Sequence, residues 1–124
     1  MYYEIITNLK ASQIPEDFLS KTSDFLVELL NIPKTVIMGH LSSEQKFDFF
    51  GSSEPCAIMH ITRGSVKPGT PQEEDAFERY AKALSEHFKK YLPIDISRLM
   101  IYYHEHNVAL MGNNGTTFKR FRKT

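Results

Sequence analysis

Two histidines and one cysteine are the side chains that most directly suggest chemistry in this sequence. His104 and His106 stand two residues apart, a spacing that places both on one face of a strand and could supply two metal ligands. The chain offers no third ligand at a suitable spacing, so we expect hydrogen-bonded or solvent-facing histidines, no metal site and no cofactor. Cys56 could be a redox thiol, but Cys56-Ala-Ile-Met59 lacks a second thiol, which favours a buried structural cysteine.

The elements that must position these side chains follow from the hydrophobic periodicity. Four segments alternate or run apolar as strands do: 2–8, 36–41, 55–62 and 98–104. Two stretches with helical spacing lie between them, each opening at one proline and closing at another, namely Pro15 and Pro33, then Pro71 and Pro93. We expect one or two short pieces of structure over 107–118. His40 and His60 fall on predicted strands and are expected to be satisfied polar groups of the sheet or of an interface.

The order strand, helix, strand occurs twice and predicts an α+β fold built from two βαβ units. Right-handed crossovers would place both helices on one face of a four-stranded mixed sheet. The other face would then lack a covering layer. We assign Tyr3, Ile5, Ile58 and Ile101 to that open face. Because these side chains are too apolar to remain in water, we expect self-association to cover them.

Length and composition bound the classes of function. The chain has 124 residues with 15 basic and 15 acidic side chains, so its formal net charge is zero. This length fits one domain, residues 1–118, followed by a basic C-terminal tail, 119–124. Balanced charge argues against a nucleic-acid partner. No run approaches 18 apolar residues and no secretory signal is visible, which predicts a cytoplasmic protein without membrane insertion.

Four short segments carry a resemblance to a known family: Thr7-Asn8, Gly51-Ser-Ser-Glu-Pro-Cys-Ala-Ile58, Arg98-Leu-Met-Ile-Tyr-Tyr103 and Gly112-Asn-Asn-Gly-Thr-Thr-Phe118. In this order and spacing, from residue 1 to about 118, the chain resembles the macrophage migration inhibitory factor family of the tautomerase superfamily. The resemblance implies a homotrimer whose sheets wall a central barrel, with three pockets at the subunit interfaces. It also implies keto–enol tautomerase (isomerase) activity on phenylpyruvate- or dopachrome-like compounds, and leaderless secretion as a cytokine.

A different residue occupies the position of the family's catalytic base in this sequence. Members begin with a processed proline whose amine moves a proton between carbon and oxygen. Counting back from Thr7-Asn8 puts Met1 at that place, and a methionine before Tyr2 is normally retained. A free α-amine ordinarily has a pKa of about 7.7–8.0. In a minority of the molecules the amine is therefore neutral at pH 7 and could act as a base. Burial in an apolar pocket would raise that neutral fraction.

The family's polar anchors are also replaced. The lysine that holds the substrate carboxylate corresponds to Ile32, which removes a charge-assisted hydrogen bond. Lys34 lies two residues on and could replace it only if the loop rearranges. The tyrosine and asparagine contributed by the neighbouring subunit correspond to Met100 and Tyr102. A tyrosine hydroxyl has thus left one position and appears two residues away on the same strand face.

The remaining pocket positions are apolar or small. An isoleucine whose backbone helps to bind substrate aligns with Gly64, while Met111 and Phe118 keep the apolar rim. Asn113 stands at the rim position where the family has a tryptophan. The predicted substrate-binding set is therefore Ile32, Gly64, Met100, Tyr102, Met111 and Phe118, with the Met1 amine as the base.

Three functions are compatible with these replacements. The first is a pseudoenzyme that acts by binding a cell-surface receptor or another protein partner. The second is a weak tautomerase with a shifted substrate, which uses the Met1 amine on a small aromatic keto or enol ligand. The third is a structural or small-molecule-binding trimer without a signalling role.

Overall fold

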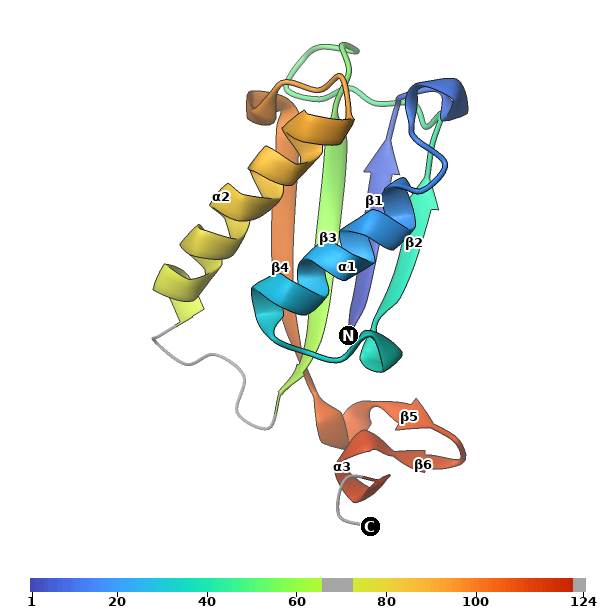
Figure 1. Ribbon diagram of the computed structural model, residues 1–124, viewed down its shortest axis with the longest axis vertical. Helices are drawn as coiled ribbons and strands as arrows, with labels where there is room; N and C mark the ends of the chain where they lie inside the picture. Colours follow the sequence, from blue (N-terminus) through green and yellow to red (C-terminus); the bar gives the residue numbers. More distant parts are fainter. Residues whose placement is uncertain (66–72, 122–124) are drawn as a thin grey trace.

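The computed structural model describes residues 1–65 and 73–121. A four-stranded sheet carries both long helices on one of its faces (Figure 1). Its strands are β1 (Tyr2–Thr7), β2 (Met38–Ser42), β3 (Ala57–Ser65) and β4 (Leu99–Asn107). The helices are α1 (Phe18–Leu30) and α2 (Glu73–Tyr91). Among the described residues, no helix has the length and hydropathy needed to cross a membrane.

The strand order confirms the two predicted βαβ units. The sheet runs β2-β1-β3-β4, with β1 parallel to β2, β3 parallel to β4, and β1 antiparallel to β3 at the centre. Helix α1 connects the first parallel pair and α2 connects the second (Figure 1). The mixed sheet and its one-sided helical layer are therefore those expected from the sequence. The predicted opening of the second helix at Pro71 lies outside the described residues.

The first helix begins later than its proline suggested. A short 3₁₀ helix, η1 (Ala11–Gln13), comes first, and α1 starts only at Phe18. The helix ends at Leu30 because Asn31 adopts the left-handed conformation, with φ of 52°, and its backbone N–H bonds the carbonyl of Val27. This cap turns the chain toward a second 3₁₀ helix, η2 (Lys34–Val36), at the start of β2.

The core lies between the sheet and the two helices. Its fully buried side chains include Tyr3, Ile5, Met59 and Ile61 from the strands and Phe18, Leu26, Leu84 and Phe88 from the helices. Burying large apolar side chains of this kind is the main favourable contribution to folding.

Three of the four residues that we assigned to the open face lie on the covered side: Tyr3 and Ile5 are buried in the core, and Ile101 is partly buried against it. The register pairs Ile5 with Met59, and Met59 with Ile101. Met59 is fully buried under the helices, so its partners share the covered side, as does Tyr3 two residues before Ile5. The prediction was wrong for Tyr3, Ile5 and Ile101, and it was right for Ile58, which alternates onto the open side.

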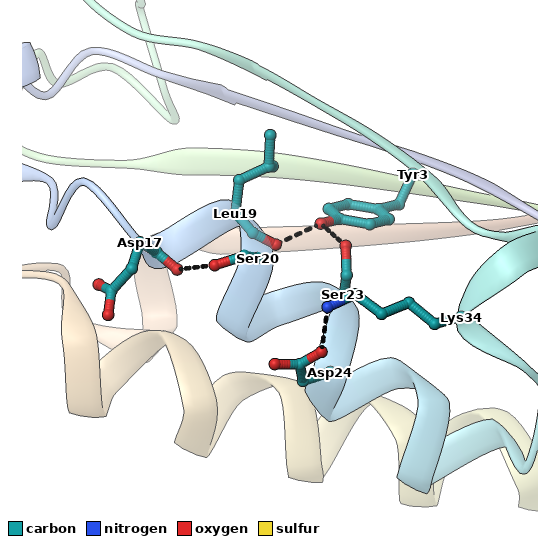
Figure 2. A network of polar contacts seen from close by, with 7 residues as sticks. All are labelled: Tyr3, Asp17, Leu19, Ser20, Ser23, Asp24 and Lys34. Atoms are coloured by element: carbon teal, nitrogen blue, oxygen red, sulfur yellow. Dashed lines mark hydrogen bonds and ion pairs between the residues drawn. The ribbon is translucent and has the colours of Figure 1, made fainter.

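Tyr3 connects the sheet directly to α1. Its hydroxyl donates to the carbonyl of Leu19 at 2.8 Å and lies 2.7 Å from Ser23 Oγ (Figure 2). The ring lies over Gly39 of β2, where an added Cβ would come within 2.3 Å of Tyr3 Cζ. The absence of a side chain at Gly39 therefore makes room for the tyrosine that joins the two layers.

The open face of the sheet is more polar than expected. Tyr2 donates from its hydroxyl to Glu4 Oε2 at 2.8 Å. His60 Nδ1 lies 2.9 Å from His104 Nε2, so one nitrogen must donate and the other accept. The Tyr102 ring stacks on His60 with its centroid 5.1 Å away. His104 is thus hydrogen-bonded, as the sequence predicted, and the open face is a mixed surface rather than an apolar one.

A small hairpin follows β4 and extends beyond the end of the sheet (Figure 1). The chain forms the 3₁₀ helix η4 (Val108–Leu110), then β5 (Gly112–Asn113), β6 (Thr116–Thr117) and the short helix α3 (Phe118–Phe121). Asn114 and Gly115 both have positive φ, as the tight turn of a two-residue hairpin requires. Helix α3 crosses the predicted boundary at residue 118, so the first residues of the expected tail are helical.

Candidate binding pocket around Met1

A cavity of about 200 Å³ lies where β1 begins and β3 ends. It collects side chains from the start of β1, the segment after α1, β3, η4 and the C-terminal hairpin. Its lining residues are Met1, Ile32, Val36, Arg63, Gly64, Val108, Met111 and Phe118. Five of the predicted site residues, Met1, Ile32, Gly64, Met111 and Phe118, therefore lie together although they are far apart in the sequence.

The backbone fixes Met1 at the edge of this pocket. Its α-amine donates to the carbonyl of Val36 at 2.5 Å, and its own carbonyl accepts from the backbone N–H of Met38 at 2.8 Å. Val36 belongs to η2, so the turn after Pro33 brings a carbonyl to the amine. The nitrogen at the position of the family's base is therefore already a hydrogen-bond donor to the main chain.

Glycine is needed at position 64 because the hairpin segment packs directly on it. A Cβ at Gly64 would lie 2.7 Å from Val108 Cγ1 and 3.1 Å from Met111 Sδ. Such contacts are too short for a side chain without displacing its neighbours. The backbone N–H of Phe118 donates to the carbonyl of Met111 at 2.8 Å, which sets the aromatic ring's position in the wall.

The position of the family's carboxylate-binding lysine is aliphatic, and its neighbour does not replace it. Ile32 follows the cap at Asn31 and contributes an apolar wall to the pocket. Lys34, the alternative cation, places Nζ 2.7 Å from Asp24 Oδ1 on α1, and both side chains are exposed (Figure 2). Lys34 does not line the pocket, so the loop has not rearranged to bring it there.

Met100 and Tyr102 lie elsewhere in the chain. They occupy β4 on the open side of the sheet, where Met100 pairs with Ile58 and Tyr102 stacks on His60. Within one chain they do not contact the pocket around Met1. Since the resemblance assigns these positions to the neighbouring subunit's wall, their role in a pocket stays a prediction.

Sequence reasoning missed three of the lining residues, Val36, Arg63 and Val108, of which Arg63 alone has an ionisable side chain. It lies in β3 two residues after the buried Ile61 and is half-buried in the lining of the cavity. Burial raises the pKa of Tyr103 on the neighbouring strand, and the Arg63 guanidinium beside it acts in the opposite direction. Strand alternation from Ile61, together with the predicted role of Gly64, was the signal that could have identified this residue.

The segments that carry the resemblance also contact one another. Asn8 donates from Nδ2 to the carbonyls of Ser53 and Glu54, both at 3.0 Å, and accepts from the backbone N–H of Cys56 at 2.9 Å. Cys56 is fully buried, and burial raises the pKa of its thiol. Both observations agree with the structural role that we predicted for this cysteine, since a thiolate is the reactive form.

A larger groove of about 490 Å³ runs between α1 and α2, away from Met1. His87 lies in it with only 6% of its surface exposed, its ring stacked 4.5 Å from that of Phe25. Its Nε2 lies 2.9 Å from Thr22 Oγ1. Burial lowers the pKa of His87, and the nearby Lys90 lowers it further. Since charges of both signs surround this groove and no predicted site residue enters it, we regard the Met1 pocket as the candidate site.

No metal cluster accompanies either cavity. Within residues 1–65 and 73–121, no group of three or more histidine, cysteine, aspartate or glutamate side chains is arranged to hold a metal ion.

Comparison with known proteins agrees with the fold. The sequence pattern of the family described as macrophage migration inhibitory factor matches residues 1–119. The macrophage migration inhibitory factor homolog of Trichinella spiralis is 33% identical over 119 residues, which cover 94% of this chain and 97% of that protein. The Rattus norvegicus macrophage migration inhibitory factor is 32% identical over 112 residues, covering 90% and 93%.

Solved structures give the same result. The Trichinella spiralis macrophage migration inhibitory factor superposes with a TM-score of 0.81 at 30% identity, covering 94% of this chain and 99% of that one. A homologue from Prochlorococcus marinus has the same fold, with a TM-score of 0.78 at 23% identity, covering 95% and 99%. The chain therefore belongs to the macrophage migration inhibitory factor family, within the tautomerase superfamily.

Proposed function

We propose that this protein is a homotrimer with a degenerate tautomerase pocket, and that it acts mainly by binding protein partners in cytokine-like signalling. The observation that carries the proposal is the composition of the pocket. Met1 stands where the family has its proline, and Ile32 stands where it has its lysine. The rigid secondary amine and the cation that anchors the substrate are both replaced, while the cavity itself is kept.

The state of the Met1 amine supports the loss of turnover. An ammonium group must lose a proton before it can take one from carbon. The Met1 amine is held as a hydrogen-bond donor to the Val36 carbonyl rather than directed into the pocket by a rigid ring. A primary amine on a flexible side chain is also less well oriented than a pyrrolidine nitrogen, and orientation contributes strongly to rate. Both features lower the activity expected on phenylpyruvate- or dopachrome-like compounds.

Family membership supports the partner-binding part of the proposal. The Trichinella spiralis and Rattus norvegicus relatives carry the name of a migration inhibitory factor. We propose that the partner is a cell-surface receptor or another protein, and that the cytoplasmic protein is also secreted.

A weak tautomerase that uses the Met1 amine is the second candidate. The specific observation in its favour is that Met1 lines an accessible cavity whose walls include Ile32 and Phe118. Such walls suit a small aromatic keto or enol ligand.

Ketonisation assays separate the two candidates. The intact mass of the purified protein first establishes that Met1 carries the free amine. Phenylpyruvate ketonisation and dopachrome methyl ester tautomerisation are then measured for this protein and for a Met1→Pro variant that retains Tyr2. The proposal predicts no robust activity in the unmodified protein, and robust activity would contradict it. Activity in the proline variant alone would mean that only the base was lost.

The assembly is tested by sedimentation. A homotrimer gives three times the chain mass of 14.3 kDa, whereas a species of 14.3 kDa would contradict the proposed assembly. In the trimer, the exposed Tyr102 would become part of a neighbour's pocket.

A further inference from the structure

The groove between α1 and α2 has the size and the walls of a ligand-binding site. Its volume of about 490 Å³ falls within the range of small-molecule sites. Aromatic rings line it, and the centroids of Phe25 and Tyr91 lie 4.5 Å and 4.9 Å from that of His87. Both helices cover the same face of the sheet (Figure 1), so an assembly through the open face would leave this groove accessible.

The hydrogen bonds of Thr22 determine which nitrogen of His87 carries the proton. Thr22 has a single hydroxyl proton and donates it to the carbonyl of Phe18 at 2.7 Å. Its Oγ1 must therefore accept from His87 Nε2, 2.9 Å away, which makes Nε2 the protonated nitrogen. In the neutral imidazole, Nδ1 is then a hydrogen-bond acceptor. Burial lowers the pKa of His87, and Lys90 lowers it further, which favours this neutral form.

The Nδ1 atom of His87 is open to the groove. Within the described part of the chain it accepts no hydrogen bond, and the side-chain atom that is sealed in the interior without a partner is Glu105 Oε2 instead. His87 is only 6% exposed, and the accessible part of its ring belongs to the groove that it lines. A ligand with an N–H or O–H donor would satisfy this acceptor.

The rim of the groove has more uncompensated acid than base. Lys21 and Asp24 form ion pairs with residues that do not line the groove. The other charged lining residues belong to no ion pair among the described residues: Glu28, Glu86 and Lys90. The Lys90 ammonium group lies over the Tyr91 ring, 5.3 Å from its centroid. Two carboxylates against one ammonium group, together with the Nδ1 acceptor, favour a ligand whose donor group is cationic.

We propose that this groove is a second binding site, which takes a small protonated amine with an aromatic body. The ammonium group of the ligand donates to His87 Nδ1 and faces the carboxylates of Glu28 and Glu86. Its ring packs against Phe25 and Tyr91, whose faces also attract the cation. The groove lies away from Met1, so the inference does not rest on the proposed function, and no outcome of the ketonisation assays affects it.

The test compares probes that differ in the charge of one group. NMR titration of the full chain measures the affinities of 2-phenylethylamine, 2-phenylethanol and 3-phenylpropanoate and maps the residues whose signals shift. We expect the amine to bind about threefold to tenfold more tightly than the alcohol, the effect of two contacts with exposed carboxylates, and the acid to bind most weakly. The nitrogen NMR signals of the His87 imidazole should identify the Nε2–H tautomer and should shift at Nδ1 when the amine binds.

Variants separate the two contributions to binding. His87→Phe keeps an aromatic ring and removes the acceptor, so it should weaken the binding of both amine and alcohol, by about twofold to tenfold. A Glu28→Gln/Glu86→Gln variant should abolish the preference for the amine and leave the affinity for the alcohol unchanged. Glu78→Gln is the matched control, because Glu78 is an exposed carboxylate of α2 outside the groove lining, and it should change neither affinity.

Three results would overturn the inference. They are no binding of the amine at millimolar concentration, an affinity for the amine no higher than that for the alcohol, and signal shifts confined to the residues around Met1. All three come from the native protein, so they do not depend on whether a variant folds. A proton on Nδ1 of His87 in the free protein would likewise contradict the argument.

Discussion

Arg98 is expected to hold the loop that precedes β3. Its guanidinium donates to four backbone carbonyls: Pro55 at 3.0 Å, Phe49 at 3.2 Å, Ser52 at 3.2 Å and Glu54 at 2.9 Å. Its Cζ also lies 4.9 Å from the centroid of the Phe49 ring. Because one side chain joins the start of β4 to all of these groups, its removal leaves several acceptors unpaired at once.

The size of the effect follows from these contacts. Three of the four hydrogen bonds are partly buried and the bond to Glu54 is exposed. A hydrogen bond to a charged group contributes about 1.5–3 kcal/mol, but water can reach loop carbonyls and recover much of that. We therefore expect Arg98→Met to lower the free energy of unfolding by about 2–4 kcal/mol. Arg98→Lys should recover about 1 kcal/mol, because an ammonium group cannot reach all four carbonyls.

Urea unfolding at fixed protein concentration measures this difference. Arg79→Met is the matched control, since Arg79 is exposed on α2 and, among the described residues, bonds only the carbonyl of Asp75, at 3.3 Å within its own helix. Its loss should cost no more than about 0.5 kcal/mol. If Arg98→Met were no more destabilising than Arg79→Met, the loop would not depend on the guanidinium and the reasoning would fail.

Three further substitutions test other contacts. Because burial lowers the pKa of His87 in the folded protein, the unfolded chain binds a proton at this residue first as the pH falls. The free energy of unfolding should therefore fall below about pH 6.5, by up to about 1.4 kcal/mol per pH unit. Urea unfolding from pH 7 to pH 5 should show a flatter dependence in His87→Phe, and an unchanged slope would refute this role. Gly64→Ala should cost about 1–3 kcal/mol in thermal or urea unfolding, because its Cβ would meet Val108 at 2.7 Å; a neutral result would mean that the hairpin moves freely. Tyr3→Phe should cost about 1–2 kcal/mol in the same assay through the loss of its hydroxyl contacts to Ser23 and α1, whereas wild-type stability would show that these contacts contribute nothing.

The order of elements could be predicted from the sequence because each element has a local signal. Alternation and helical spacing, interrupted by prolines, identified the two βαβ units and the short pieces after β4. Which face a strand residue occupies depends on pairing, which is not local. Tyr3 and Ile5 were assigned to the open face because they are apolar, yet their register with β3 places them under the helices.

Only part of the pocket could be predicted, again because contacts between distant segments bring its residues together. Met1 could be located by counting back from Thr7-Asn8, and Ile32 by its correspondence to the family lysine in the segment after the first helix; both line the cavity. Arg63 corresponds to no family position that the resemblance marked, so only strand alternation and the fold bring it to the same place. The wall that Met100 is expected to form depends on a second subunit, which one sequence does not specify.

The catalytic efficiency of phenylpyruvate ketonisation tests the central claim most directly. We compare the native protein, with its N-terminal mass verified, with a Met1→Pro/Ile32→Lys variant that carries both family groups. Since a charge-assisted hydrogen bond alone corresponds to about a tenfold to hundredfold effect, the account predicts that the native protein is at least about tenfold slower. A native kcat/KM equal to or above that of the double variant would contradict it.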